Sequence, residues 1–195
     1  FRSCIIWLEK FEKAGQKMIT IKKKKKKVQT QLKANNPVIL AMVVEKKGSA
    51  PRGVGAHMLI LSDGSTVDTI GGGPLEYLAI QEAKQNLKNG KSIVQTFSLN
   101  NATAGEYGMV CGGQLTVALY CLQKKDLVQV EKALTLINTK NKIVLSLSWQ
   151  EENFDFKVYD LAESFALKEK LTKKSLLQMD TTNQSGQYLE IMKQS

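Results

Sequence analysis

The chain has 195 residues, of which 43% are hydrophobic, and carries a formal net charge of +10. This composition suits one compact domain or two small lobes and excludes disorder throughout, and no stretch reaches the roughly 18 consecutive apolar residues of a membrane span, so we expect a soluble protein with no membrane partner. The three cysteines, Cys4, Cys111 and Cys121, lack CxxC spacing, which favours a reducing cytoplasm over a secreted disulfide scaffold.

The positive charge is concentrated in a basic leader, residues 1–35. This segment holds eleven Lys or Arg residues against two Glu, which leaves a net charge of +1 for residues 36–195. The unbroken run Lys22 to Lys27 would bind RNA or another acidic surface through counterion release, or it is simply solvated. No aromatic residue interleaves the run to stack on bases, so nucleic acid is not an expected partner.

After residue 35 the pattern becomes that of a folded α/β domain, residues 36–195. We divide it into a lobe that bears the motifs, residues 36–122, and a degenerate second lobe, residues 123–195. In the first part we expect a buried strand, a loop rich in glycine, a hairpin and a helix that starts at a proline and ends before Gly90. The corresponding ranges are Pro37–Val44, Glu45–Gly55, Ala56–Leu61 with Thr66–Ile70, and Pro74–Asn89.

The remaining sequence continues to alternate between strands and helices. We expect strands at Ser92–Leu99, Gln114–Leu122, 142–149, 153–159 and 187–192, helices at 126–138 and 160–172, and a long loop between the first two strands. Residues 31–44 also align without gaps to residues 136–149, each as a helix end, a turn and an apolar strand. The fold class is therefore α/β, a mixed β-sheet with flanking helices that allows two similar lobes.

Three consecutive glycines, Gly71, Gly72 and Gly73, precede the helix that starts at Pro74. A glycine turn that opens a helix leaves backbone N–H groups bare at the positive end of the helix dipole, which favours phosphate or another anion. The alternative is a tight turn that only glycine can adopt. Glu76, in the first turn of the helix, is either a partner of the dipole or a polar residue of a site.

Two further segments carry chemistry. Arg52 ends the sequence Gly48-Ser49-Ala50-Pro51-Arg52 just beyond the buried strand, and its guanidinium suits phosphate or carboxylate, although it could also pair with a surface acid. Cys111 is followed by Gly112 and Gly113, and a cation nearby would favour its thiolate, which is nucleophilic and binds soft metals. The alternative is a small residue in a packed turn. Ser49 lacks a His and Asp partner for a triad, and the single histidine, His57, lies in a strand pattern and is expected to be structural.

These motifs, in this order, resemble the XdhC/CoxI family, the xanthine dehydrogenase accessory proteins. The segments are Gly48-Ser49-Ala50-Pro51-Arg52, Thr69-Ile70-Gly71-Gly72-Gly73-Pro74-Leu75-Glu76 and Met109-Val110-Cys111-Gly112-Gly113. The resemblance implies a carrier that binds molybdenum cofactor (molybdopterin), protects it during sulfuration and helps insert it into a molybdenum hydroxylase. It also implies a client hydroxylase and a sulfur-donating cysteine desulfurase as partners, and it allows a homodimer.

The resemblance assigns these segments to one cofactor site. The expected contacts are Ser49, Arg52, Gly71, Gly72, Gly73, Glu76, Cys111, Gly112 and Gly113, and Cys111 would also contact molybdenum or assist sulfur transfer. Longer family members carry a C-terminal Rossmann domain, whereas here neither glycine cluster continues as G-x-G-x-x-G, so we expect a short form that does not bind NAD. Asp68 also departs from the family pattern, because many relatives have glycine there.

Two other functions stay open on the residues alone. One is a phosphate- or nucleotide-dependent transferase that uses Cys111 as its nucleophile. The other is an RNA-associated protein that acts through Lys22 to Lys27. The first predicts turnover that depends on Cys111, and the second predicts RNA binding that falls steeply with salt.

Overall fold

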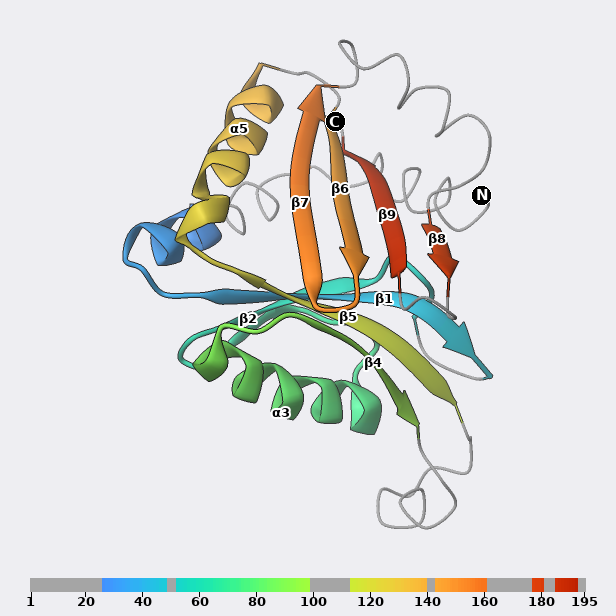
Figure 1. Cartoon of the computed structure of the whole chain (residues 1–195). Coiled ribbons are helices and arrows are strands. Elements are labelled where there is room, and N and C mark those ends of the chain that lie inside the picture. Colours follow the sequence, from blue (N-terminus) through green and yellow to red (C-terminus); the bar gives the residue numbers. More distant parts are fainter. Residues whose placement is uncertain are drawn as a thin grey trace. The chain divides into compact units, whose positions relative to one another are not determined.

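The computed structural model describes residues 26–48, 52–98, 113–139, 143–160, 177–180 and 185–192 (Figure 1). The chain divides into two compact units. One unit is formed by Asn36–Gln123, and the described residues before and after it belong to the other. Among the described residues, no helix is both long and apolar enough to span a membrane.

The unit that carries the motifs is built on a five-stranded sheet in the order β3-β2-β1-β5-β4. Every described pairing in this sheet is antiparallel. Helix α3 connects β3 to β4. The elements are β1 (Val38–Lys47), β2 (His57–Leu61), β3 (Thr66–Asp68), α3 (Gly73–Asn89), β4 (Ile93–Ser98) and β5 (Gln114–Leu122).

One core fills the space between this sheet and α3. Side chains alternate along a strand, so one set from each strand faces the helix. In β5 the set is Leu115, Val117, Leu119 and Cys121, as the alternation predicted. The helix contributes the buried residues Leu75, Ala79, Ala83 and Leu87. Their helical spacing orients α3 on the sheet and fixes the position of its first turn.

Both ends of α3 follow the sequence signals. Pro74 lies in the first turn, where its missing N–H costs no helical hydrogen bond. Gly90 has the left-handed conformation of a helix C-cap, with φ 64°, and its amide donates to the Asn86 carbonyl. The Gln123 side chain donates from Nε2 to the Gly90 carbonyl at 2.9 Å, which ties this end of α3 to the end of β5.

The other unit contains a four-stranded antiparallel sheet in the order β7-β6-β9-β8. Its helix α5 packs on β7 and β6, where Ala133 and Val158 are buried together. The Gln129 side chain accepts a hydrogen bond from the Val158 amide at 2.9 Å. The elements are the 3-10 turn η1 (Lys124–Asp126), α5 (Leu127–Asn138), β6 (Ile143–Gln150), β7 (Asn153–Asp160), β8 (Leu177–Asp180) and β9 (Ser185–Met192).

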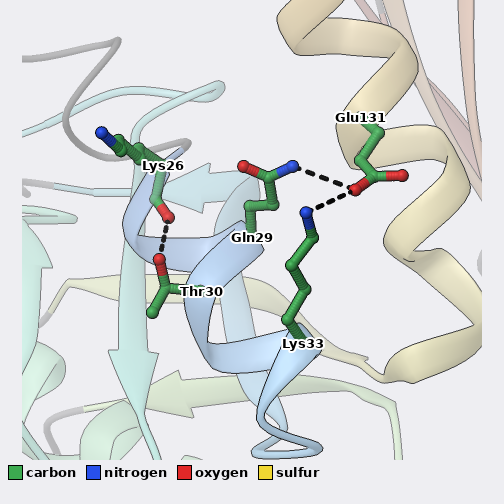
Figure 2. A network of polar contacts seen from close by, with 5 residues as sticks. All are labelled: Lys26, Gln29, Thr30, Lys33 and Glu131. Atoms are coloured by element: carbon green, nitrogen blue, oxygen red, sulfur yellow. Dashed lines mark hydrogen bonds and ion pairs between the residues drawn. The ribbon is translucent and has the colours of Figure 1, made fainter.

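Residues 26–33 form a helix in this second unit, although the sequence assigns them to the basic leader. Val28 and Leu32 are buried, which explains why the segment folds despite its charge. Figure 2 shows its polar side: Glu131 of α5 accepts from Gln29 at 3.0 Å and pairs with Lys33 at 3.0 Å. These contacts hold the pKa of the exposed Glu131 carboxyl below its usual value, chiefly through Lys33 and then Gln29.

The predicted fold class, α/β with helices flanking the sheet, is confirmed. Strand β1 runs to Lys47, three residues beyond its predicted end, because Glu45 to Lys47 continue to pair with β5. The short strand β8 was not predicted. A helix was expected at 160–172, but Asp160 is the last residue of strand β7. The rest of that helix lies outside the described residues.

Replacing Gly186 with Ala should destabilise the second unit. Gly186 pairs with Trp149 across β9 and β6, and a Cβ at this position would lie 2.3 Å from an indole carbon of Trp149. The indole is buried and stacks with Phe154, so it cannot move aside without disturbing the packing. We expect a loss of about 1–2 kcal/mol in the free energy of unfolding, measured by denaturant titration. An unchanged value would contradict the close contact.

Candidate functional site

The segments that carry the motifs leave the sheet at one end. Strands β1, β3 and β4 run in the same direction because each is antiparallel to β2 or β5. Gly48 to Arg52 follow β1, the triple glycine follows β3, and the segment with Cys111 connects β4 to β5. Figure 1 shows the heads of β1 and β4 on the same side as the first turn of α3. We call this region the motif end of the sheet.

The three glycines adopt backbone angles that other residues avoid. Gly71, Gly72 and Gly73 have φ values of 147°, 73° and 70°. Gly72, the N-cap of α3, combines its φ with a ψ of −178°, a region that is essentially reserved for glycine. The loop turns the chain from the edge strand β3 into α3 over these residues.

The amides of this loop already hold an anion, the side chain of Glu76. Its Oε2 atom accepts from the amides of Ile70 at 2.8 Å, Gly71 at 3.2 Å and Gly72 at 2.9 Å. The Thr69 hydroxyl donates to the same oxygen and accepts from the Gly71 amide at 3.0 Å. Four donors thus converge on one carboxylate oxygen, so Glu76 serves as the anion that the glycine turn and helix dipole favour.

These contacts lower the pKa of Glu76. Partial burial opposes ionisation and by itself would raise the pKa, but the hydrogen bonds from Thr69 and from the amides of Gly72, Ile70 and Gly71 together outweigh it. The side chain therefore stays ionised at neutral pH. The negative charge next to the glycines belongs to the protein itself.

Strands β1 to β4 and the glycine loop lie in a part of the chain that matches known proteins. Residues 31–98 match the model of the XdhC and CoxI family, and this range includes β1 to β4 with the glycine loop. The chain is also 39% identical over 83 residues to YqeB of Escherichia coli strain K12, which is described as uncharacterized.

A solved structure shares the fold of this chain. It is titled a xanthine dehydrogenase from Bacillus halodurans, and it matches with a TM-score of 0.61 and 16% identity over 86% of this chain. At this identity the likeness shows the fold alone. The chain spans 52% of the Bacillus chain and 15% of YqeB, so the activities of the whole relatives do not transfer directly.

Arg52 of the family motif is exposed at the motif end. Within the described part of the chain, no acidic side chain forms an ion pair with its guanidinium. Asp68, at φ 75°, is exposed as well. The ring of His57 lies 3.3 Å from the Gly55 carbonyl through Nδ1. Arg52 is therefore an exposed cation at this end of the sheet, without an ion pair to the described acidic residues.

A chain of hydrogen-bonded polar side chains at the motif end, which we call the polar chain, was not predicted from the sequence. The Thr116 hydroxyl donates to Glu45 Oε2 at 3.0 Å, and the hydroxyls of Thr116 and Thr96 are 2.9 Å apart. Lys47 pairs with the other oxygen of Glu45 at 3.3 Å. Sequence reasoning placed Glu45 in a loop, which hid its pairing with Thr116.

Three of the expected contacts, Ser49, Cys111 and Gly112, lie outside the described residues, whereas Gly113 is described and buried. The remaining expected contacts all lie at the motif end. Among the described residues, no group of three or more His, Cys, Asp or Glu side chains is arranged to hold a metal ion. The metal contact of Cys111 stays a prediction.

Replacing Gly72 with Ala tests the backbone of the glycine loop. A Cβ at Gly72 would meet open space, so the cost comes only from the backbone angles. We expect a loss of about 1–2 kcal/mol in the free energy of unfolding. Gly53→Ala is the matched control, because Gly53 also has open space around it but no positive φ. Equal stability of the two variants would contradict the conformation described here.

Proposed function

We propose that this chain acts in the maturation of a molybdenum hydroxylase of the xanthine dehydrogenase type. It would bind molybdenum cofactor, support its sulfuration and help to insert it into the client. The observation that carries this proposal is that the segments with the three motifs adjoin one end of a single sheet. The first two of these motifs lie within residues 31–98, the range that matches the XdhC and CoxI family. A shared site for one ligand explains why these segments emerge together.

The residues at the motif end fit the cofactor in part. Molybdenum cofactor carries a phosphate, a pterin and a metal held by a dithiolene, and it supplies the molybdenum centre that the hydroxylase uses. Arg52 provides an exposed cation for the phosphate. The glycine loop does not provide a free anion site, because its amides at Ile70, Gly71 and Gly72 are bonded to Glu76. Its role in the proposal is to fix the shape of the site.

Cys111 completes the proposed site through its sulfur. A thiolate is a soft ligand, so it suits contact with molybdenum or a part in sulfur transfer. The proposal also includes a cysteine desulfurase as sulfur donor, the client hydroxylase as acceptor, a homodimer and a cytoplasmic location. A carrier of this kind passes the cofactor on and does not turn over a metabolite.

The maturation of a client hydroxylase tests the proposal. The client is produced in cells that make molybdenum cofactor, with and without the protein that contains this chain. We expect the client to gain molybdenum, sulfido ligand and activity when the protein is present. Equal molybdenum and sulfur content in the two preparations would overturn the maturation role.

Replacing Cys111 with Ala should lower the molybdenum content of the purified protein. If the sulfur contacts the metal, the loss of this soft ligand weakens retention of the cofactor by about tenfold or more. Molybdenum per chain, measured by elemental analysis, is the readout, and Cys121→Ala is the control because Cys121 is buried in the core. Unchanged molybdenum with a loss of sulfur transfer would assign Cys111 to the transfer step instead.

A further inference from the structure

Strand β1 contains a β-bulge that turns Glu45 away from α3. Val43 pairs with Val117 of β5, and Glu45 pairs with the adjacent residue Thr116. Val44, which lies between Val43 and Glu45, is therefore an extra residue in β1. Without the bulge, alternation would place Glu45 on the same face as Val43, beneath the helix. With it, Glu45 shares the opposite face with Thr116. Bulges commonly re-aim a side chain next to a functional site.

The residue that holds Glu45 is buried. Thr116 is only 7% exposed, and its single hydroxyl proton goes to Glu45 Oε2. Thr96 must therefore be the donor in its contact with Thr116. Burying the Thr116 hydroxyl costs free energy that an apolar side chain at the same position would avoid. The chain of hydroxyls is better explained by the fixed position that it gives to the carboxylate.

Glu45 remains open to a ligand. Its side chain is 34% exposed, and each carboxylate oxygen has one neighbour and a second lone pair to offer. The neighbour of Oε1, Lys47, is 67% exposed on the side chain, so this contact is weak and easily exchanged. Glu45 lies three residues before Gly48, at the motif end of the sheet.

We propose that Glu45 is a specificity-determining residue that accepts hydrogen bonds from the aminopyrimidinone edge of a pterin. That edge presents an amino group next to a ring N–H, and two parallel N–H donors match the two oxygens of a carboxylate. Thr116 and Thr96 position the carboxylate, while Arg52 serves the phosphate. This inference rests on the proposed function and identifies the pterin edge as the part of the cofactor that Glu45 recognises.

Two small pteridines test the inference directly. Pterin has the 2-amino group, whereas lumazine has a carbonyl oxygen there, which would face the carboxylate as a second acceptor. We expect the wild-type chain to bind pterin at least about tenfold more tightly than lumazine, measured by fluorescence titration. In Glu45→Gln this ratio should fall to about one, because the amide presents one acceptor and one donor. Glu82→Gln, on α3, should keep the wild-type ratio.

A second variant separates recognition from folding. Thr116→Val removes the hydroxyl at nearly constant volume, so we expect a ratio several-fold below that of the wild type without a fall in the melting temperature. Equal wild-type affinity for the two pteridines, binding of neither, or an unchanged ratio in Glu45→Gln would overturn the inference. Cofactor that purifies with the wild-type protein would, in each of these cases, leave the proposed function standing.

Discussion

Replacing Glu76 with Ala should lower the free energy of unfolding of the motif-bearing unit by about 3 kcal/mol. The substitution removes the oxygen on which the amides of Ile70, Gly71 and Gly72 converge, together with the Thr69 hydroxyl. Hydrogen bonds to a charged acceptor are the strong ones, and their donors here sit in a partly buried loop. Chemical denaturation at neutral pH measures the effect.

The matched control is Glu82→Ala on the same helix. Glu82 accepts a long hydrogen bond from the Asn86 side chain at 3.4 Å, so this change should cost no more than about 0.5 kcal/mol. Equal losses in the two variants would show that Glu76 contributes only as a helical residue. They would contradict its role as the anion of the glycine loop.

The contribution of Glu76 should also depend on pH in a defined direction. The pKa of Glu76 is lower in the folded protein than its ordinary value of 4.5. A carboxyl with a depressed folded pKa adds stability above the unfolded pKa and loses it as the pH falls through the folded pKa. The stability difference between the wild type and Glu76→Ala should therefore be full at pH 7 and shrink below about pH 4.5. A difference that stays constant down to pH 3 would contradict the assignment.

Replacing Arg52 with Ala should weaken the binding of molybdenum cofactor by about tenfold to a hundredfold, because a charge-assisted contact to phosphate contributes this much to the affinity. Arg52 is exposed at the motif end, and no ion pair within the described residues competes for it. Anaerobic titration with released cofactor gives the Kd. Because Arg52 lies on the surface, the melting temperature should stay unchanged.

Lys91→Ala controls for the general loss of a positive charge. Lys91 is exposed and precedes β4, so it lies at the end of the sheet opposite the motifs. Its removal should change the Kd less than twofold. A similar loss in the two variants would indicate attraction by net charge and would remove Arg52 from the site.

The glycine loop shows how much of the local structure can be predicted from the sequence. The triple glycine, Pro74 and the apolar spacing predicted the turn, the helix and its ends, because each depends on local backbone preferences. The anion was also predicted, but its source was not. Glu76 lies four residues beyond Gly72, and only the positive φ values of the loop bring those amides onto its Oε2 atom.

The polar chain at Glu45 shows what the sequence could not supply. Glu45, Thr96 and Thr116 are far apart in sequence, and their contact depends on two strand registers and on the bulge at Val44. A shift of one residue in register would send each side chain to the other face of the sheet. The alternation of side chains between the two faces of β5 could be predicted from the sequence, whereas the pairing between strands could not.

The most direct test of the central claim, that the motif end holds molybdenum cofactor, is the cofactor content of the purified protein. The protein is isolated without oxygen from cells that make the cofactor, and molybdenum and pterin are measured per chain. We predict that the two are retained in a constant ratio by the wild type and Lys91→Ala, and that both are lost together in Arg52→Ala. A wild-type protein free of molybdenum and pterin, or equal contents in all three, would contradict the account.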